Sequence, residues 1–175
     1  MDRRHRWNGF QRLWFAAHFH QPLLMESPMQ IRPAHLNDMA ALLELVNMLF
    51  DAEHELVFDA EKSRRGFELM LAPSDDRLVL VAEVDGVVQG LCTGQMLIST
   101  AMGTPSLWVE DVIVRPEMRG RGIMPQLLGA LEKWAIEKGA SRVQLLCDME
   151  NELGLGFYPK MGYAKMQMVG FQKVF

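Results

Sequence analysis

The stretch VRPEMRGRGIMPQLL, residues 114–128, decides how this sequence is interpreted. A hydrophobic run ends at Pro116, two arginines then alternate with two glycines, and an apolar segment with helical spacing follows at once. The first turn of a helix presents unpaired N–H groups and a partial positive charge, and glycine lets the backbone approach a ligand closely. The pattern therefore predicts a cradle for a phosphate group, to which Arg119 and Arg121 add cationic side chains.

Three kinds of nucleotide site can be compared with this loop. A P-loop requires Lys-Ser or Lys-Thr directly after its last glycine, and the loop has neither pair. The dinucleotide fingerprint G-x-G-x-x-G matches Gly120 and Gly122 but meets Pro125 at its third glycine. The third kind is a site for the pyrophosphate of coenzyme A, and an ordinary glycine-rich turn is the alternative that needs no ligand.

Hydrophobic periodicity on either side of the loop predicts an α/β (α+β) fold with the order βααβββαβαβ. Asp85-Gly86 separates two β-branched runs and predicts a two-residue hairpin turn. Asn37 or Asp38 is expected to cap the first helix. Strands are expected at residues 29–34, on both sides of the hairpin turn, and at 106–114, 141–148 and 163–175, with helices around 42–49, 61–71, 122–138 and 151–158.

Composition narrows the classes of function. A net charge of −4 does not favour a broad nucleic-acid-binding surface. No apolar run reaches the roughly 18 residues that a membrane-spanning helix needs. The two cysteines do not make a disulfide framework, so a cytoplasmic location is expected. All five histidines lie in the first third of the sequence, which argues against a metal site or a Ser-His triad built with the later motifs.

Residues 1–28 form an N-terminal extension that differs from the rest of the chain. The segment carries four arginines against one aspartate and one glutamate. Two interpretations are open: a disordered or loosely docked tail, or a misassigned translation start with Met25 or Met29 as the real first residue. One domain is expected over residues 29–175.

Two motifs together resemble the Gcn5-related N-acetyltransferase (GNAT) family. Its Q/R-x-x-G-x-G/A signature is similar to the run from Arg119 to Met124, where Met124 replaces a small residue. Its second pattern, N-x-x-A-x-x-x-Y, is similar to Asn151, Gly154 and Tyr158, with Gly162-Tyr163 following. The run IRPAHLNDMAALLELV, residues 31–46, also resembles the first strand and helix of the family. The resemblance implies a central mixed, mostly antiparallel sheet flanked by helices, with acetyl-CoA as cosubstrate.

The resemblance also assigns residues to acetyl-CoA. Backbone groups at Val112 and Val114 would hold the pantetheine arm as if it were an extra strand. Asn151, the first residue of the second motif, would also belong to the acetyl-CoA site. The pyrophosphate would bind to the loop residues Arg119, Gly120, Arg121, Gly122, Ile123 and Met124.

The chemistry of amine acetylation needs a base and an acid, because an amine attacks a thioester only when it is unprotonated. Glu110 is the first candidate for the base, with Asp111 or a water held by the backbone as alternatives. Strand alternation predicts that Glu110 and Asp111 point to opposite faces, so that only one faces the reaction centre. Tyr158 matches the general acid of the family. Pro159 is expected to push the backbone of Tyr158 away from helical geometry.

The sequence thus predicts an acetyl-CoA-dependent N-acetyltransferase that transfers an acetyl group to the primary amine of a small molecule by direct attack. The alternatives are a protein or peptide N-acetyltransferase and a non-catalytic acyl-CoA-binding module. Five acids between Asp51 and Glu61 lie where the family forms its acceptor site. Two interpretations are open: they attract a cationic amine, or most of them form a solvated acidic face. The expected partner is a small amine, with no nucleic acid, membrane or metal, and a homodimer is left open.

Overall fold

The computed structural model describes residues 29–52 and 57–174. The N-terminal extension and two of the five predicted acids, Glu53 and Glu55, lie outside the described residues. Within them, no helix is long and apolar enough to cross a membrane.

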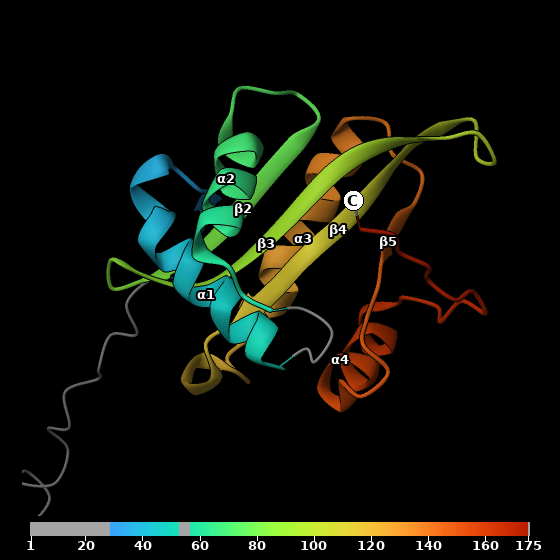
Figure 1. Cartoon of the computed structure of the whole chain (residues 1–175). Helices are drawn as coiled ribbons and strands as arrows, with labels where there is room; N and C mark the ends of the chain where they lie inside the picture. The colour runs from blue at the N-terminus through green and yellow to red at the C-terminus, as the bar shows by residue number, and fades with distance from the viewer. Residues whose placement is uncertain (1–28, 53–56, 175) are drawn as a thin grey trace, which may run out of the picture.

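A five-stranded sheet with the order β1-β2-β3-β4-β5 organises the molecule (Figure 1). The first four strands pair antiparallel, and β5 runs parallel to β4. The mixed, mostly antiparallel sheet predicted from the sequence is therefore confirmed. The strands are β1 (Gln30–Pro33), β2 (Arg77–Val84), β3 (Val87–Ser99), β4 (Thr104–Val114) and β5 (Val143–Leu145).

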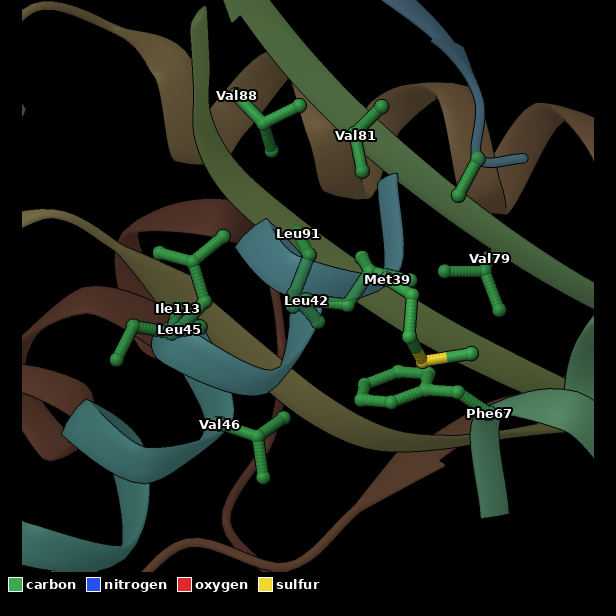
Figure 2. Close-up of a cluster of buried hydrophobic side chains, with 11 residues drawn as sticks. Met39, Leu42, Leu45, Val46, Phe67, Val79, Val81, Val88, Leu91 and Ile113 are labelled. Carbon is green, nitrogen blue, oxygen red and sulfur yellow. The ribbon is translucent and has the colours of Figure 1, made fainter. Parts of the chain in front are cut away.

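Helices cover both faces of this sheet. On one face lie α1 (Met39–Ala52) and α2 (Ala60–Leu71), and on the other lies α3 (Ile123–Glu137) (Figure 1). Figure 2 shows the first interface, where Leu42 and Leu45 of α1 and Phe67 of α2 pack on strand residues such as Val81 and Leu91. Short helical turns complete the fold: η1 (Leu36–Asp38), η2 (Pro116–Met118), α4 (Glu152–Phe157) and η3 (Tyr158–Met161).

The predicted hairpin turn and the main helix are both confirmed. Asp85 and Gly86 have φ values of 55° and 74°, as a type I′ turn requires at both central residues. The helix predicted at 122–138 is α3, which ends before Gly139 with its φ of 84°. Its buried stripe includes Leu127, Leu128 and Leu131.

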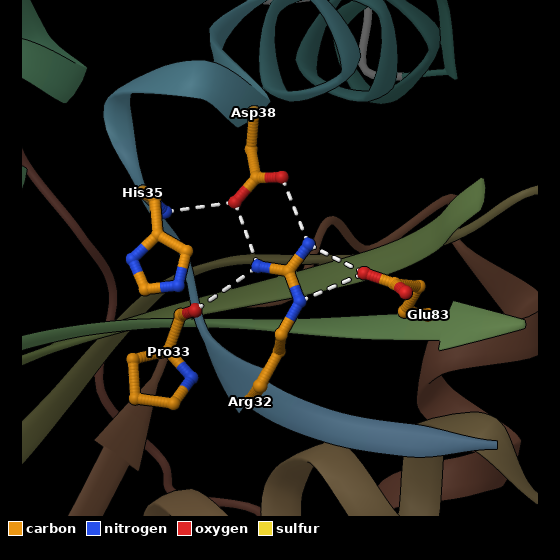
Figure 3. A network of polar contacts seen from close by, with 5 residues as sticks. All are labelled: Arg32, Pro33, His35, Asp38 and Glu83. Atoms are coloured by element: carbon orange, nitrogen blue, oxygen red, sulfur yellow. Dashed lines mark hydrogen bonds and ion pairs between the residues drawn. The ribbon is translucent and has the colours of Figure 1, made fainter. Parts of the chain in front are cut away.

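A network around Arg32 joins β1, β2 and the start of the first helical segment (Figure 3). The guanidinium of Arg32 donates to both carboxylate oxygens of Asp38 at 2.8 and 2.9 Å and to Glu83 at 2.6 and 2.8 Å. Asp38 also accepts from the His35 N–H at 2.7 Å. The bond from Arg32 lowers the pKa of the Asp38 carboxyl. Asp38 thus caps the chain just before α1, as one half of a reciprocal capping arrangement.

The strand predicted at 163–175 is wrong over its described part. Residues 164–174 form no strand, and the observed order ends with α4 and η3. A strand needs a neighbouring backbone to satisfy its N–H and C=O groups. The neighbour available here is β5, which has only three residues and already pairs with β4 along its other edge. Apolar alternation in this segment therefore does not suffice to form a strand.

Candidate active site

A β-bulge in β4 places the two acids of the WVED run. Cys92 of β3 pairs with Val112, and Gly94 pairs with Val109, so that Glu110 and Asp111 together lie opposite Thr93. Because two residues of β4 lie opposite one residue of β3, the usual alternation of side chains between the two faces is interrupted here. The prediction that the acids point to opposite faces is therefore wrong, because alternation holds only along an unbroken ladder.

Both acids line one cavity of about 400 Å³ between the sheet and the pair α1 and α2. Its floor includes Arg77 of β2, Thr93 and Gln95 of β3, and the two acids of β4. The walls are mostly apolar and come from the two helices. The wall residues are Val46 and Phe50 of α1 and Ser63, Gly66, Phe67, Leu69 and Met70 of α2.

The two acids have different surroundings. Glu110 is exposed, and its Oε2 accepts a hydrogen bond from Trp108 Nε1 at 2.7 Å. Asp111 is largely buried, and its Oδ2 accepts from Thr93 Oγ1 at 2.8 Å. Burial raises the pKa of Asp111 to about 6; the nearby charge of Glu110 adds to this effect and the Thr93 bond opposes it. Asp111 is thus an acid whose proton affinity approaches the range useful for a base at neutral pH.

Next to the bulge, β4 presents backbone groups on its β5 side. Parallel pairing with β5 stops at Val109 and Leu145. The N–H groups of Asp111 and Arg115 donate toward β3, to Thr93 Oγ1 at 3.0 Å and Gln89 O at 2.9 Å. Because the direction of N–H groups alternates along a strand, the amides of Val112 and Val114 face away from β3. They are therefore available to an extended ligand beyond the end of the β4–β5 pairing.

The glycine loop leads from this strand into α3. Gly120 and Gly122 both have a φ of 75°, and a Cβ added at either would meet no atom within 4 Å. Arg119 Nε donates to the Val114 carbonyl oxygen at 3.2 Å and fastens the loop to the end of β4. Two glycines in left-handed conformation with open space above them, at the first turn of a helix, fit a bound phosphate group.

The next two residues of the signature point inward. Ile123 is a core residue with 2% of its surface exposed, and Met124 packs against the same cluster under α3. Because both side chains pack into the core, their backbone N–H groups remain available to a ligand. Met124 in place of a small residue fills core space under the helix.

The second motif forms the N-terminus of α4. Asn151 Oδ1 accepts the Gly154 N–H at 2.8 Å, which is a helix cap. A Cβ at Gly154 would lie 2.8 Å from Cys147 Sγ, so that the alanine of the family pattern would collide with this cysteine. The side chain of Cys147 thus explains why the sequence has glycine here.

Tyr158 has helical geometry in spite of the proline that follows it. Its φ and ψ are −58° and −40°. The prediction that Pro159 would prevent this geometry is wrong, because Pro159 lies in the first turn of η3, where its missing N–H is not needed. The Tyr158 ring lies 5.5 Å from that of Phe157 and 5.7 Å from that of Tyr163.

Tyr158 and the acids line different cavities. Tyr158 packs on the α3 side of the sheet and lines a cavity of about 580 Å³ formed with β5, α4 and the following chain. The acids line the cavity on the α1 and α2 side. The structure thus brings Glu110 and Asp111 together and places Tyr158 across the sheet. Sequence reasoning missed Thr93, Gln95 and Arg77, because the register that gathers them depends on a bulge without a local sequence signal.

The model of the acetyltransferase (GNAT) family matches residues 41–163. The chain belongs to this family. It is therefore an acetyltransferase, and acetyl-CoA is its cosubstrate; the glycine loop and the exposed side of β4 fit this group.

Solved structures share the fold at low sequence identity. AAC(6')-Iy, an aminoglycoside N-acetyltransferase solved with CoA, is 21% identical, with a TM-score of 0.72 over 85% of this chain and 95% of that one. The glucosamine-6-phosphate N-acetyltransferase of Arabidopsis thaliana is 22% identical, with a TM-score of 0.68 over 85% and 99%. A putative acetyltransferase from Agrobacterium tumefaciens is 25% identical, with a TM-score of 0.69 over 83% and 99%.

Proposed function

We propose that this acetyltransferase acetylates the primary amine of a small molecule, with residues 29–175 as its catalytic domain. The observation that carries the proposal is the bulge in β4, which turns two carboxyl groups into one cavity, next to a stretch of β4 at Val112 and Val114 that does not pair with β5. Similar folds act on amines of this kind: one is an aminoglycoside N-acetyltransferase and another a glucosamine-6-phosphate N-acetyltransferase. A cavity of about 400 Å³ suits a small molecule.

Acetyl-CoA would bind along β4 and the start of α3. The backbone N–H groups of residues 120–124, with the charges of Arg119 and Arg121, would hold the pyrophosphate. The amides of Val112 and Val114 would pair with the pantetheine arm. Asn151 caps α4 and would hold this helix on the other side of the arm.

The acidic pair would supply the base. Glu110 is exposed and is the first candidate to contact the ammonium group, whereas burial raises the pKa of Asp111 to about 6 and so favours its acceptance of a proton. Once the amine has lost a proton to one of these carboxylates, its nitrogen attacks the thioester carbonyl. The C–N bond forms, and the attacking nitrogen gives up its second proton to a carboxylate of the pair or to water. The C–S bond breaks, and the electron pair of that bond leaves on sulfur.

Tyr158 would return a proton to the leaving thiolate. Its position on the opposite side of the sheet from the acids suits this role, because the thioester would lie between them beyond the end of the β4–β5 pairing. The amine would then approach from one face and the acid from the other. Glu110 and Asp111 therefore act on nitrogen and Tyr158 on sulfur.

A two-stage experiment tests this function. Acetyl-CoA at millimolar concentration should raise the melting temperature of the protein by ligand linkage. Amines, polyamines, aminophosphonates, amino acids, aminoglycosides and amine-bearing peptides are then screened with acetyl-CoA for release of free thiol. Thiol release with small amines supports the proposal. Release with peptides alone would favour a protein acceptor, and a melting shift without release for any acceptor would favour a non-catalytic binding module.

A homodimer in the cytoplasm is also proposed. The segment after η3 exposes Met168, Val169 and Phe171 by 80%, 77% and 94%, and exposed apolar groups of this kind mark association surfaces. Neither Cys92 nor Cys147 forms a disulfide, in keeping with a reducing compartment. Light scattering at micromolar concentration measures the mass, and a monomer mass would contradict the dimer.

A further inference from the structure

Arg77 is a cation in the cavity that forms no ion pair with any residue in the described part of the chain. It is the first residue of β2 and lines the cavity with Glu110 and Asp111. Its Nε is shielded from solvent and has no hydrogen-bond partner. No hydrogen bond or ion pair joins Arg77 to either acid of the cavity: Glu110 accepts from Trp108, and Asp111 accepts from Thr93.

Comparison with other arginines of the structure sets Arg77 apart. Arg32 makes ion pairs with Asp38 and Glu83, and Arg115 makes a bidentate pair with Glu44 at 2.7 and 2.8 Å. Arg142 also has a shielded Nε, but its terminal nitrogen donates to Ser99 at 3.1 Å. A sheltered donor without a partner costs stability, so its retention in a cavity indicates a ligand.

We propose that Arg77 binds an anionic group of the acceptor, so that the substrate is a small primary amine that also carries a carboxylate, a phosphonate or a phosphate ester. This inference rests on the proposed acetylation of a small amine. Arg77 would form a charge-assisted, bidentate bond with the anionic group, while the acids on β4 receive the ammonium group. The cavity thus recognises both ends of one molecule.

The register of the sheet sets the distance between Arg77, which would bind the anion, and Glu110, which would receive the ammonium group. Arg77 lies opposite Gln95, Gln95 lies opposite Trp108, and Glu110 is two residues beyond Trp108. Two strand spacings and one side-chain repeat separate the Cα atoms of Arg77 and Glu110 by roughly 12 Å. Both side chains are long and reach into the same cavity, so the amine and the anion of the acceptor are only a few bonds apart. The side-chain amide of Gln95 lies between them and lines the same cavity.

Matched pairs of amines test the inference. β-Alanine is compared with β-alaninamide, and 2-aminoethylphosphonate with ethanolamine, together with the same pairs lengthened by one to three methylene groups. For wild type, kcat/KM from thiol release should be at least about tenfold higher for the anionic member of the best pair, since one charge-assisted bond is worth about that factor or more. Whether the carboxylate or the phosphonate series gives the larger ratio identifies the anion.

The variant Arg77→Gln should bring that ratio close to one, because KM for the anionic amine rises much more than KM for its neutral partner. Arg77→Lys should keep part of the preference. The melting temperature of Arg77→Gln should equal or exceed that of wild type, because the change removes an unpaired, sheltered charge. A melting temperature lowered by several degrees, with equal losses on both members of a pair, would assign Arg77 a structural role and overturn the inference.

Other results separate this inference from the proposed function. If wild type acetylates neutral amines as well as anionic ones, and Arg77→Gln does the same, the acetyltransferase function stands and the anion site is wrong. If no amine reacts, the anionic amines are tested for a further melting shift in the presence of CoA. A shift in wild type that is lost in Arg77→Gln supports the anion site, and no shift in wild type overturns it.

Discussion

At the scale of single residues, the proposed chemistry depends on the difference between Glu110 and Asp111. The two are neighbours in sequence and line one cavity, yet one is exposed and the other is sheltered beside Thr93. Burial is the main cause that raises the pKa of Asp111 to about 6. This difference leads to two predictions.

The first prediction concerns the pH dependence of catalysis. If Asp111 accepts the proton, it must be ionised, so kcat/KM should rise as pH increases through about 6. This inflection should persist in Glu110→Gln and disappear in Asp111→Asn. The defect of the variant that lacks the base should shrink as pH approaches the pKa of the amine, because more substrate is then neutral. The measurement is a pH–rate profile on an acceptor found by the screen.

Tyr158→Phe is the control for these profiles. It removes an acid instead of a base, so turnover should fall by about 10²–10⁴ without rescue at high pH. If Asp111→Asn keeps the inflection and Glu110→Gln loses it, Glu110 is the base, as the family resemblance implies. Full activity of both variants at neutral pH would leave a water held by the backbone as the base.

The second prediction concerns stability. The pKa of Asp111 is raised in the folded state, so the protonated form favours folding. This contribution is complete below about pH 4 and is lost as pH rises through about 6. Asp111→Asn keeps an oxygen for the Thr93 bond and carries no charge. At pH 8 it should therefore unfold with a free energy higher than that of wild type, by at most about 3 kcal/mol. Chemical denaturation at pH 4 and 8 measures this, and a less stable variant at pH 8 contradicts it.

At the scale of elements, regular pieces with strong local signals were predictable. The Asp85-Gly86 turn, α3 with its apolar stripe, and the short helix α4 each follow from residues close together in the sequence. The bulge at Glu110 and Asp111 was not predictable, because it is set by the register with β3. The prediction of a final strand at 163–175 was wrong for the same reason. A strand needs the edge of a neighbouring strand, and the local sequence pattern does not reveal whether one is available.

The third prediction compares two glycines of one element. Gly122 has a φ of 75° at the start of α3, whereas Gly129 lies inside the helix with open space around it. Gly129→Ala should stabilise the fold by about 1 kcal/mol, and Gly122→Ala should destabilise it by roughly 1–2 kcal/mol. Gly122→Glu should also abolish the melting shift with acetyl-CoA, through bulk and like charge. Gly129→Ala should keep this shift; if both variants keep it, the loop is not the pyrophosphate site.

At the scale of the whole molecule, segments distant in sequence converge on the sheet. The Arg32 network fixes β1 against β2 (Figure 3), and the pair of Arg115 and Glu44 ties the end of β4 to α1. These contacts hold the helical wall of the cavity against its floor. All of them lie within residues 29–174, which leads to a prediction for the N-terminal extension.

The fourth prediction is that a shortened chain beginning at Met25 folds and binds acetyl-CoA as tightly as the full chain. Among the described residues, buried apolar clusters already lie on both faces of the sheet. Thermal unfolding and calorimetric titration measure both properties. A large loss of stability on truncation would show that aromatic residues of the extension pack on the domain.

The most direct test of the account is mass spectrometry of the amine screen with acetyl-CoA, run on wild type and on the double variant Glu110→Gln/Asp111→Asn. Both changes keep size and hydrogen-bonding oxygens and remove the two carboxylates of the cavity. We predict that wild type yields a small amine carrying one acetyl group on nitrogen, and that the double variant binds acetyl-CoA equally well but forms this product at least about 10²-fold more slowly at neutral pH. A wild-type protein that binds acetyl-CoA but acetylates no small amine, or a double variant as fast as wild type, would contradict the account.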